Sequence, residues 1–224
     1  MDKSWGLPIV SVEPPLPKAG RGTNEKAIAM SMIGCFYALS DEDLNAIMDQ
    51  PKRVERLWAK EMAQFEREKP APSFWSKLFG AKPAAKQVDD DPWQAGPAEA
   101  FDVDKAWHGI HFLLTGSEWE GAGPLAFVLH GGREIKHDLG YGSPHGFSAA
   151  EVKEIARALA DLDLKALYER ADPAEFTRLE IYPTIYNSEP KEECIGYVID
   201  NLKDLREFVQ QTAAANRALI AYLG

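Results

Sequence analysis

Two histidines and an aspartate recur at helical spacing in the middle of the chain. Asp104, His108 and His111 are four and three residues apart, so a helix would place them on one narrow stripe beside an apolar face. Two imidazoles and a carboxylate can form part of a metal site, or a general base that an acid orients. The plain alternative is that Asp104 favours a helix start and the histidines bond nearby backbone. We predict no metal, because catalytic metals usually take ligands from several elements.

A glycine-rich loop supplies two further candidate binding residues, Asp138 and Tyr141. It follows an apolar run at 125–129, and glycine lets backbone approach a ligand closely. Neither GxxxxGK[ST] nor GxGxxG leading into a helix occurs, so phosphate binding is only weakly indicated. A turn or a pair of strands would explain the glycines equally well. We predict that this loop meets the histidine helix in one compact cleft, with Trp107 as its apolar anchor.

An aromatic and basic segment lies at 74–79. Phe74, Trp75, Leu78 and Phe79 would share one helical face with lysines around it. Such a segment can lie on a membrane surface or dock in a partner, or it can pack against its own protein, which would shield its aromatic rings. We do not expect membrane contact, because one short helix anchors weakly.

The elements that must position these residues follow from hydrophobic periodicity and capping signals. Residues 1–29 contain clustered prolines and glycines and indicate an irregular arm. Residues 67–100 are broken by five prolines and indicate a basic insertion in the remaining domain, 30–224. We expect strands at 30–39, 125–129 and 218–223, and helices at 104–114, 149–162, 164–170, 173–179 and 189–216. Helical spacing also extends over 40–66, where Pro51 ends a first helix or begins a second one. These elements predict an α/β fold, with α+β possible, built on a small central mixed sheet covered by helices.

Composition excludes several classes of protein. The chain has 224 residues, of which 45% are hydrophobic, and its formal net charge is −10. That charge argues against nucleic acid as a partner, because neutralising phosphates requires clustered basic residues. The two cysteines, Cys35 and Cys194, cannot build a disulfide framework and fall in apolar segments typical of inert thiols. We predict a cytoplasmic protein without a resident cofactor.

Four separated motifs resemble one known family. They are MIGCFYALSDEDL at 32–44, DKAWHGIHFLLTG at 104–116, DLGYG at 138–142 and IYP at 181–183. In this order they resemble the YfbM-like family of uncharacterised bacterial proteins. The resemblance implies a single α/β domain with a central sheet, and it implies no reaction, cofactor or substrate.

Three functional hypotheses remain open. The first is a module that binds an unknown protein or small molecule in a cleft lined by Asp104, Trp107, His108, His111, Asp138 and Tyr141. The second is a small-molecule enzyme in which His108 or His111 is the general base and Asp104 orients it. The third is a peripheral module recruited through Phe74–Phe79. Histidines that are buried and bonded to backbone would end the enzyme hypothesis, because a catalytic base must face an open cavity.

Overall fold

The computed structural model describes residues 32–57 and 91–224. The chain divides into two units, 1–30 and 31–224, and all described residues belong to the second. The predicted arm at 1–29 and the aromatic segment Phe74–Phe79 lie outside the described residues, as do 58–66 of the predicted helix and most of the predicted insertion.

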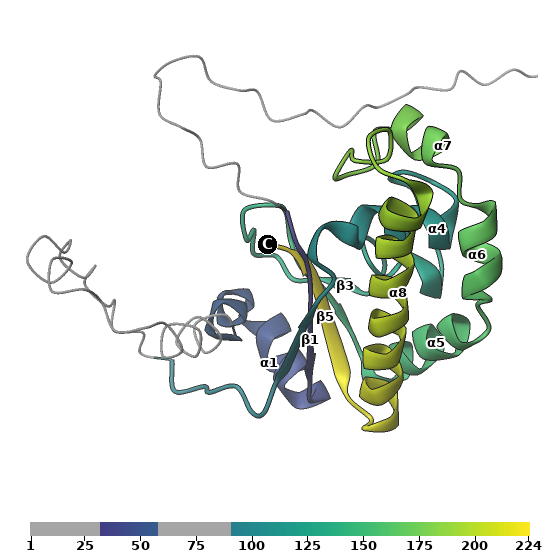
Figure 1. Ribbon diagram of the computed structural model, residues 1–224. Coiled ribbons are helices and arrows are strands. Elements are labelled where there is room, and N and C mark those ends of the chain that lie inside the picture. The colour runs from purple at the N-terminus through teal and green to yellow at the C-terminus, as the bar shows by residue number, and fades with distance from the viewer. Residues whose placement is uncertain (1–31, 58–90) are drawn as a thin grey trace, which may run out of the picture. The chain divides into compact units, whose positions relative to one another are not determined.

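A five-stranded sheet forms the middle of the second unit (Figure 1). Its strands are β1 (Gly34–Leu39), β2 (Glu99–Asp102), β3 (Arg133–Glu134), β4 (His145–Phe147) and β5 (Ala218–Leu223), in the spatial order β2-β1-β5-β4-β3. Each of the four pairs is antiparallel. The central pair runs from Gly34 opposite Leu223 to Leu39 opposite Ala218.

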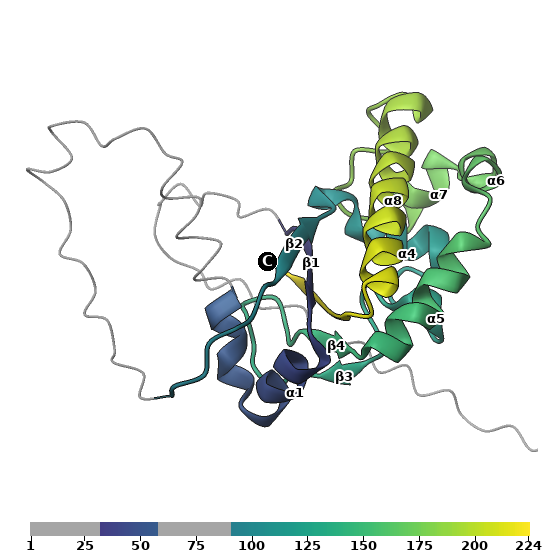
Figure 2. The ribbon, with the colours of Figure 1, turned by 90° about the horizontal axis from the view of Figure 1, so that it is seen from below.

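The two faces of the sheet carry separate hydrophobic clusters, because successive strand side chains point to opposite sides. In β1, Phe36 and Ala38 pack in the larger cluster, whereas Tyr37 and Leu39 pack in the smaller one. The larger cluster is covered by α4, α5 and α8, and the smaller one by α1 (Figures 1 and 2). The sheet therefore separates two regions of the molecule.

Several of the described helices begin where the sequence offers a side-chain cap. Ser40 accepts from the Asp43 N–H and starts α1 (Asp41–Asp49), which leads to the 3-10 turn η1 (Pro51–Val54). Ser148 and Glu151 form a complete capping box at the start of α5 (Ala149–Ala160). The other helical elements are η2 (Asp104–Ala106), α4 (Trp107–Thr115), η3 (Pro124–Ala126), α6 (Leu164–Arg170), α7 (Pro173–Arg178) and α8 (Lys191–Ala214).

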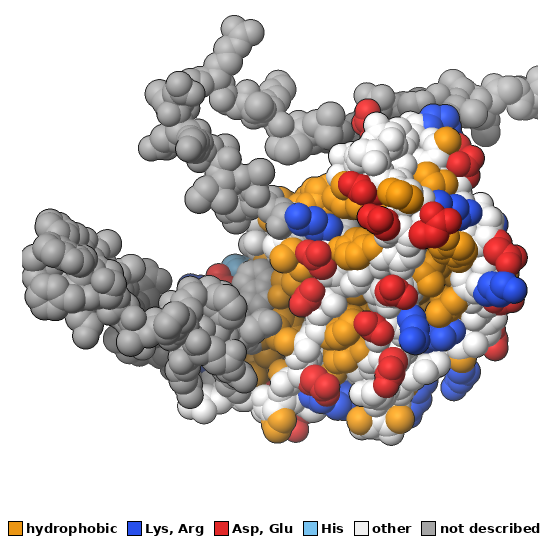
Figure 3. All heavy atoms as spheres, viewed as in Figure 1, with side chains coloured by type: hydrophobic (Ala, Val, Ile, Leu, Met, Phe, Trp, Pro, Cys, Tyr) orange, Lys and Arg blue, Asp and Glu red, His pale blue; other side chains and the backbone are white. Residues whose placement is uncertain are grey.

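The longest described helix, α8, packs one face on the core and exposes the other. The residues that recur at helical spacing on its inner face are all buried: Cys194, Val198, Leu202, Leu205, Phe208, Val209 and Thr212. On the outer face over α8, acidic and basic side chains are interspersed with apolar atoms (Figure 3). This face has the mixed character of an ordinary solvated surface.

The α/β or α+β fold class is confirmed, and several details are corrected. The sheet is antiparallel rather than mixed, because strand direction depends on long-range pairing that local periodicity does not report. The apolar run at 125–129 is not a strand: Pro124 opens the turn η3, and the N–H groups of Leu129 and His130 both bond the Ala126 carbonyl. A short buried apolar run does not distinguish these conformations.

Residues 91–100 of the expected insertion lie within the described structure. Asp91 accepts from Arg53 at 2.6 Å, and Trp93 lies under the Arg53 and Arg56 guanidinium groups. Hydrogen bonds from Arg53 and from the Trp93 N–H lower the pKa of Asp91 to about 2. Residues from 91 onward are therefore part of the folded unit, and β2 begins at Glu99.

Candidate functional site

A loop that follows α4 is the most distinctive polar arrangement in the described structure. Gly116 ends the helix in the left-handed conformation, with φ of 74°, and its N–H bonds the Phe112 carbonyl at 2.8 Å. Glycine suits this position because it has no Cβ to clash. The chain then turns back, and we call residues 117–121 the clasped loop.

Three histidines bond three consecutive carbonyls of the clasped loop. His108 Nε2 donates to the Glu118 oxygen at 2.8 Å, and His111 Nε2 donates to the Glu120 oxygen at 3.1 Å. Between them, His130 Nε2 donates to the Trp119 oxygen. Two of the donors come from α4, and the third follows η3. The backbone of the clasped loop is thus fixed from both sides.

The two helical histidines are buried and neutral. His108 Nδ1 accepts from the Tyr182 N–H at 3.0 Å, so the proton sits on Nε2. Burial lowers the pKa of His108, although its bond to the Glu118 carbonyl acts in the opposite direction. Burial and the neighbouring His130 lower the pKa of His111 to about 4. His111 Nδ1 has no hydrogen-bond partner among the described residues.

Close packing holds the clasped loop against α4. A Cβ added at Gly121 would lie 2.8 Å from Ala126 Cβ, 3.1 Å from Thr115 Cγ2 and 3.2 Å from His111 Cε1. Contacts under 3.0 Å force a neighbour to move, so the absence of a side chain here allows the close approach.

The clasped loop presents an exposed tryptophan. Trp119 is 54% exposed, although its ring centroid lies only 4.3 Å from that of His108 and 6.3 Å from that of Trp107. Trp107 is itself buried, stacks on Tyr182 at 5.7 Å and donates to the Met32 carbonyl at 3.3 Å. An aromatic cluster therefore extends from the core to the surface and ends in the Trp119 indole.

Asp104 does not join the histidines. It has a left-handed φ of 45° in η2, before α4 begins, so the helical count does not apply to it. Its carboxylate accepts from the Tyr197 hydroxyl at 2.9 Å, and that hydroxyl accepts from the Lys105 N–H at 3.0 Å. Burial and this bond to Asp104 raise the pKa of Tyr197. Asp104 thus links η2 to α8.

Asp138 and Tyr141 lie on the other side of the sheet. Their neighbours Ile135 and Leu139 pack in the smaller cluster with α1, whereas Trp107 and Ile110 of α4 pack in the larger one. The Asp138 carboxylate accepts from the Gly140 and Gly142 N–H groups, and these bonds lower its pKa. Asp138 therefore closes a local turn, and the structure does not bring the six candidate residues into one cleft.

This geometry removes the support for a general base. Both candidate histidines are buried and bonded to backbone, and the carboxylate expected to orient them is bonded to Tyr197. Within residues 32–57 and 91–224, no three His, Cys, Asp or Glu side chains are grouped to hold a metal ion. The described contacts therefore give no support to His108 or His111 as a general base.

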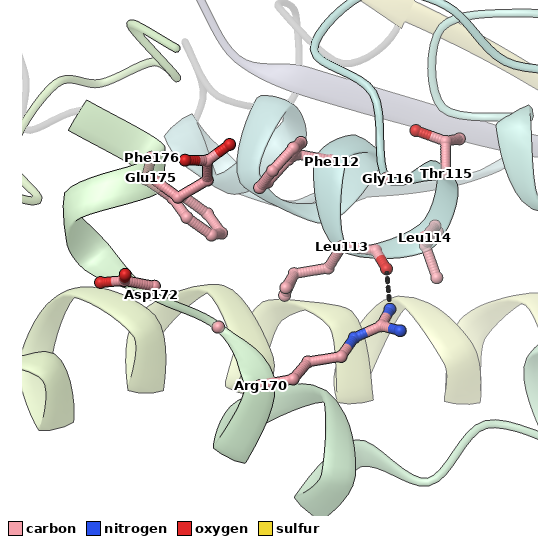
Figure 4. A pocket seen from close by; sticks show the side chains of 10 residues that line it. Phe112, Leu113, Leu114, Thr115, Gly116, Arg170, Asp172, Glu175 and Phe176 are labelled. Atoms are coloured by element: carbon pink, nitrogen blue, oxygen red, sulfur yellow. Dashed lines mark hydrogen bonds between the residues drawn. The ribbon is translucent and has the colours of Figure 1, made fainter. Parts of the chain in front are cut away.

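A separate cavity of about 350 Å³ lies at the C-terminal end of α4 (Figure 4). Arg170 of α6 extends beneath that end and donates to the Leu113 carbonyl at 2.8 Å. Of the two carboxylates that line the cavity, Glu175 is bonded to Arg178 and Asp172 caps α7. Each of these charged side chains thus has a hydrogen-bond partner within the protein.

The sequence analysis does not single out three residues that form the clasped loop or hold it in place. Trp119 lies in a polar, glycine-containing loop, where an aromatic residue between two glutamates is a signal of an exposed contact. His130 directly follows the apolar run at 125–129, and nothing in the local sequence indicates that it bonds the Trp119 carbonyl. Tyr182 appears in the IYP motif, but no local pattern indicates that its backbone meets His108.

Comparisons with known proteins place this architecture in a family. A domain family described as "Domain of unknown function (DUF1877)" matches residues 30–222. The chain belongs to this family. A solved structure titled as a protein of unknown function, YfbM from Escherichia coli, is similar over 86% of this chain and 99% of its own, with 17% identity and a TM-score of 0.56. That likeness concerns the fold alone, and comparison with curated proteins gives no match. Among the helices described, none combines the length and apolar character needed to cross a bilayer.

Proposed function

We propose that this DUF1877 member is a binding module that engages a partner through Trp119 of the clasped loop. The observation that carries the proposal is the contrast between a fixed backbone and an exposed indole. Three side-chain hydrogen bonds hold the loop, yet Trp119 remains 54% exposed. A preorganised tryptophan loses little conformational entropy on binding and is a common hot-spot residue of interfaces.

The proposal modifies the binding module predicted from the sequence. Trp107, His108 and His111 support the contact surface from below instead of lining a cleft. Asp104, Asp138 and Tyr141 are not part of it. A cytoplasmic site of action belongs to the proposal, supported by the buried thiol of Cys194, whose pKa burial raises.

Quantitative affinity capture from a cell lysate tests the proposal. The full-length protein and its Trp119→Ala and Tyr141→Ala variants are immobilised at equal density, and bound proteins are quantified by mass spectrometry. Tyr141 is the matched control, because it is the other exposed large hydrophobic residue described and lies across the sheet. We expect a stoichiometric partner that Trp119→Ala loses and Tyr141→Ala retains. A partner that Trp119→Ala retains would contradict the proposal.

A further inference from the structure

The stretch of sequence that carries Trp119 has no basic residue close to it. No lysine or arginine occurs between Lys105 and Arg133, whereas Glu118 and Glu120 flank the tryptophan. The two histidines of α4 contribute no positive charge at neutral pH, since burial disfavours their charged form. The indole is thus presented from a segment whose only charged side chains are acidic.

Among the described residues, the cation that interacts with this segment already has a carboxylate partner of its own. Arg178 of α7 interacts electrostatically with Glu118. Its guanidinium donates twice to the Glu175 carboxylate, at 2.6 and 3.0 Å. Glu120 is exposed. Its hydrogen bond to the Ser117 hydroxyl is made by its backbone N–H and not by its carboxylate. Negative charge beside Trp119 is therefore not fully balanced within the described structure.

We infer that the Trp119 surface recognises a basic segment of a partner protein, with a lysine or arginine side chain placed over the indole. Tryptophan offers the most favourable ring face for a cation, and Glu118 and Glu120 supply charge complementarity for basic residues next to it. An acidic or phosphate-bearing partner would be repelled by the same carboxylates, and a purely apolar helix would desolvate them without compensation. This inference rests on the proposed function.

Fluorescence anisotropy with labelled octapeptides tests the inference on the full-length chain. The probes are an alternating Lys-Ser peptide, its Arg-Ser and Glu-Ser counterparts, and a Gly-Ser peptide, each titrated at low and at physiological salt. A Trp119→Leu variant keeps apolar surface but removes the π face, and Glu118→Gln/Glu120→Gln removes the flanking charge. Far-UV circular dichroism confirms that each variant is folded.

A matched charge control is essential, because a chain of net charge −10 attracts basic peptides at many places. Glu192→Gln/Glu193→Gln changes the net charge by the same two units, at exposed positions in the first turn of α8. We expect Trp119→Leu and Glu118→Gln/Glu120→Gln each to weaken binding of the basic peptides about tenfold, the size typical of a partly desolvated cation–π or ion pair. The α8 control should retain binding within about twofold.

The outcomes separate this inference from the proposed function. Equal weakening by the two glutamine pairs would show attraction to net charge only and would overturn the inference. Binding that is insensitive to Trp119→Leu, or equal affinity for the Glu-Ser peptide, would overturn it as well. If capture from lysate still depends on Trp119 in those cases, the docking surface stands and the basic partner does not. If capture is independent of Trp119, both fail.

Discussion

Acidification should destabilise the clasped loop through His111. Its folded-state pKa is about 4, against an ordinary value of 6.5. Because the folded state disfavours the protonated imidazole, the contribution of His111 to stability is complete above pH 6.5 and is lost as the pH falls toward 4. These two values give a loss of about 2 kcal/mol between pH 7 and pH 5, and at most about 3 kcal/mol in total. Burial acts on His108 in the same direction.

Urea denaturation of the wild type and a His111→Gln variant, followed by circular dichroism from pH 7 to pH 4.5, measures this loss. Glutamine can still donate to the Glu120 carbonyl but does not titrate. Between pH 7 and pH 5, we expect the free energy of unfolding of the variant to fall by about 2 kcal/mol less than that of the wild type. The effect of the carboxylates cancels in this difference, because both proteins contain them. Parallel curves for the two proteins would refute the reasoning. So would a proton NMR titration that places the pKa of His111 near 6.5.

The remaining predictions concern packing and caps, and each is measured by urea denaturation at pH 7. Gly121→Ala should cost about 1–3 kcal/mol, since its Cβ would overlap Ala126 and crowd His111; a neutral effect would contradict the close packing of the clasped loop. Leu202→Ala should cost about 2–5 kcal/mol, because this side chain on the inner face of α8 is fully buried. Ser148→Ala should cost about 1 kcal/mol through loss of the capping box. Trp119→Ala should change stability by less than about 1 kcal/mol, as its ring is more than half exposed.

Features that depend on residues close together in the sequence were predictable. The start of α5 at Ser148 follows from a capping box within four residues, and the buried stripe of α8 follows from helical period over many turns. The strand predicted at 218–223 has the same bounds as β5. Its short apolar sequence suits the buried position that the strand takes in the sheet. In each case the local preference and the tertiary contacts select the same conformation.

Features that depend on distant partners were not predictable. The helical spacing that grouped Asp104 with the histidines assumed one continuous helix. Asp104 instead adopts a left-handed conformation and bonds Tyr197, 93 residues away. Separation of Asp138 from α4 depends on which face of the sheet the loop reaches, and this follows from strand order. The two flanking glutamates indicate that Trp119 is exposed, but its contacts with His108 and with the histidine-bonded loop depend on the tertiary structure.

The central strand pair has a consequence for how the polypeptide assembles during synthesis. β1 and β5 join residues about 180 positions apart, and reciprocal backbone bonds between Ile33 and Gly224 continue the pairing beyond them. Both hydrophobic clusters use side chains of β5, so neither is complete until that strand has joined the sheet. A nascent chain carrying everything up to α8 would expose unpaired edges of β1 and β4 in the meantime. Folding of this domain thus depends on a pairing of high sequence separation, and the strand edges stay exposed until that pairing forms.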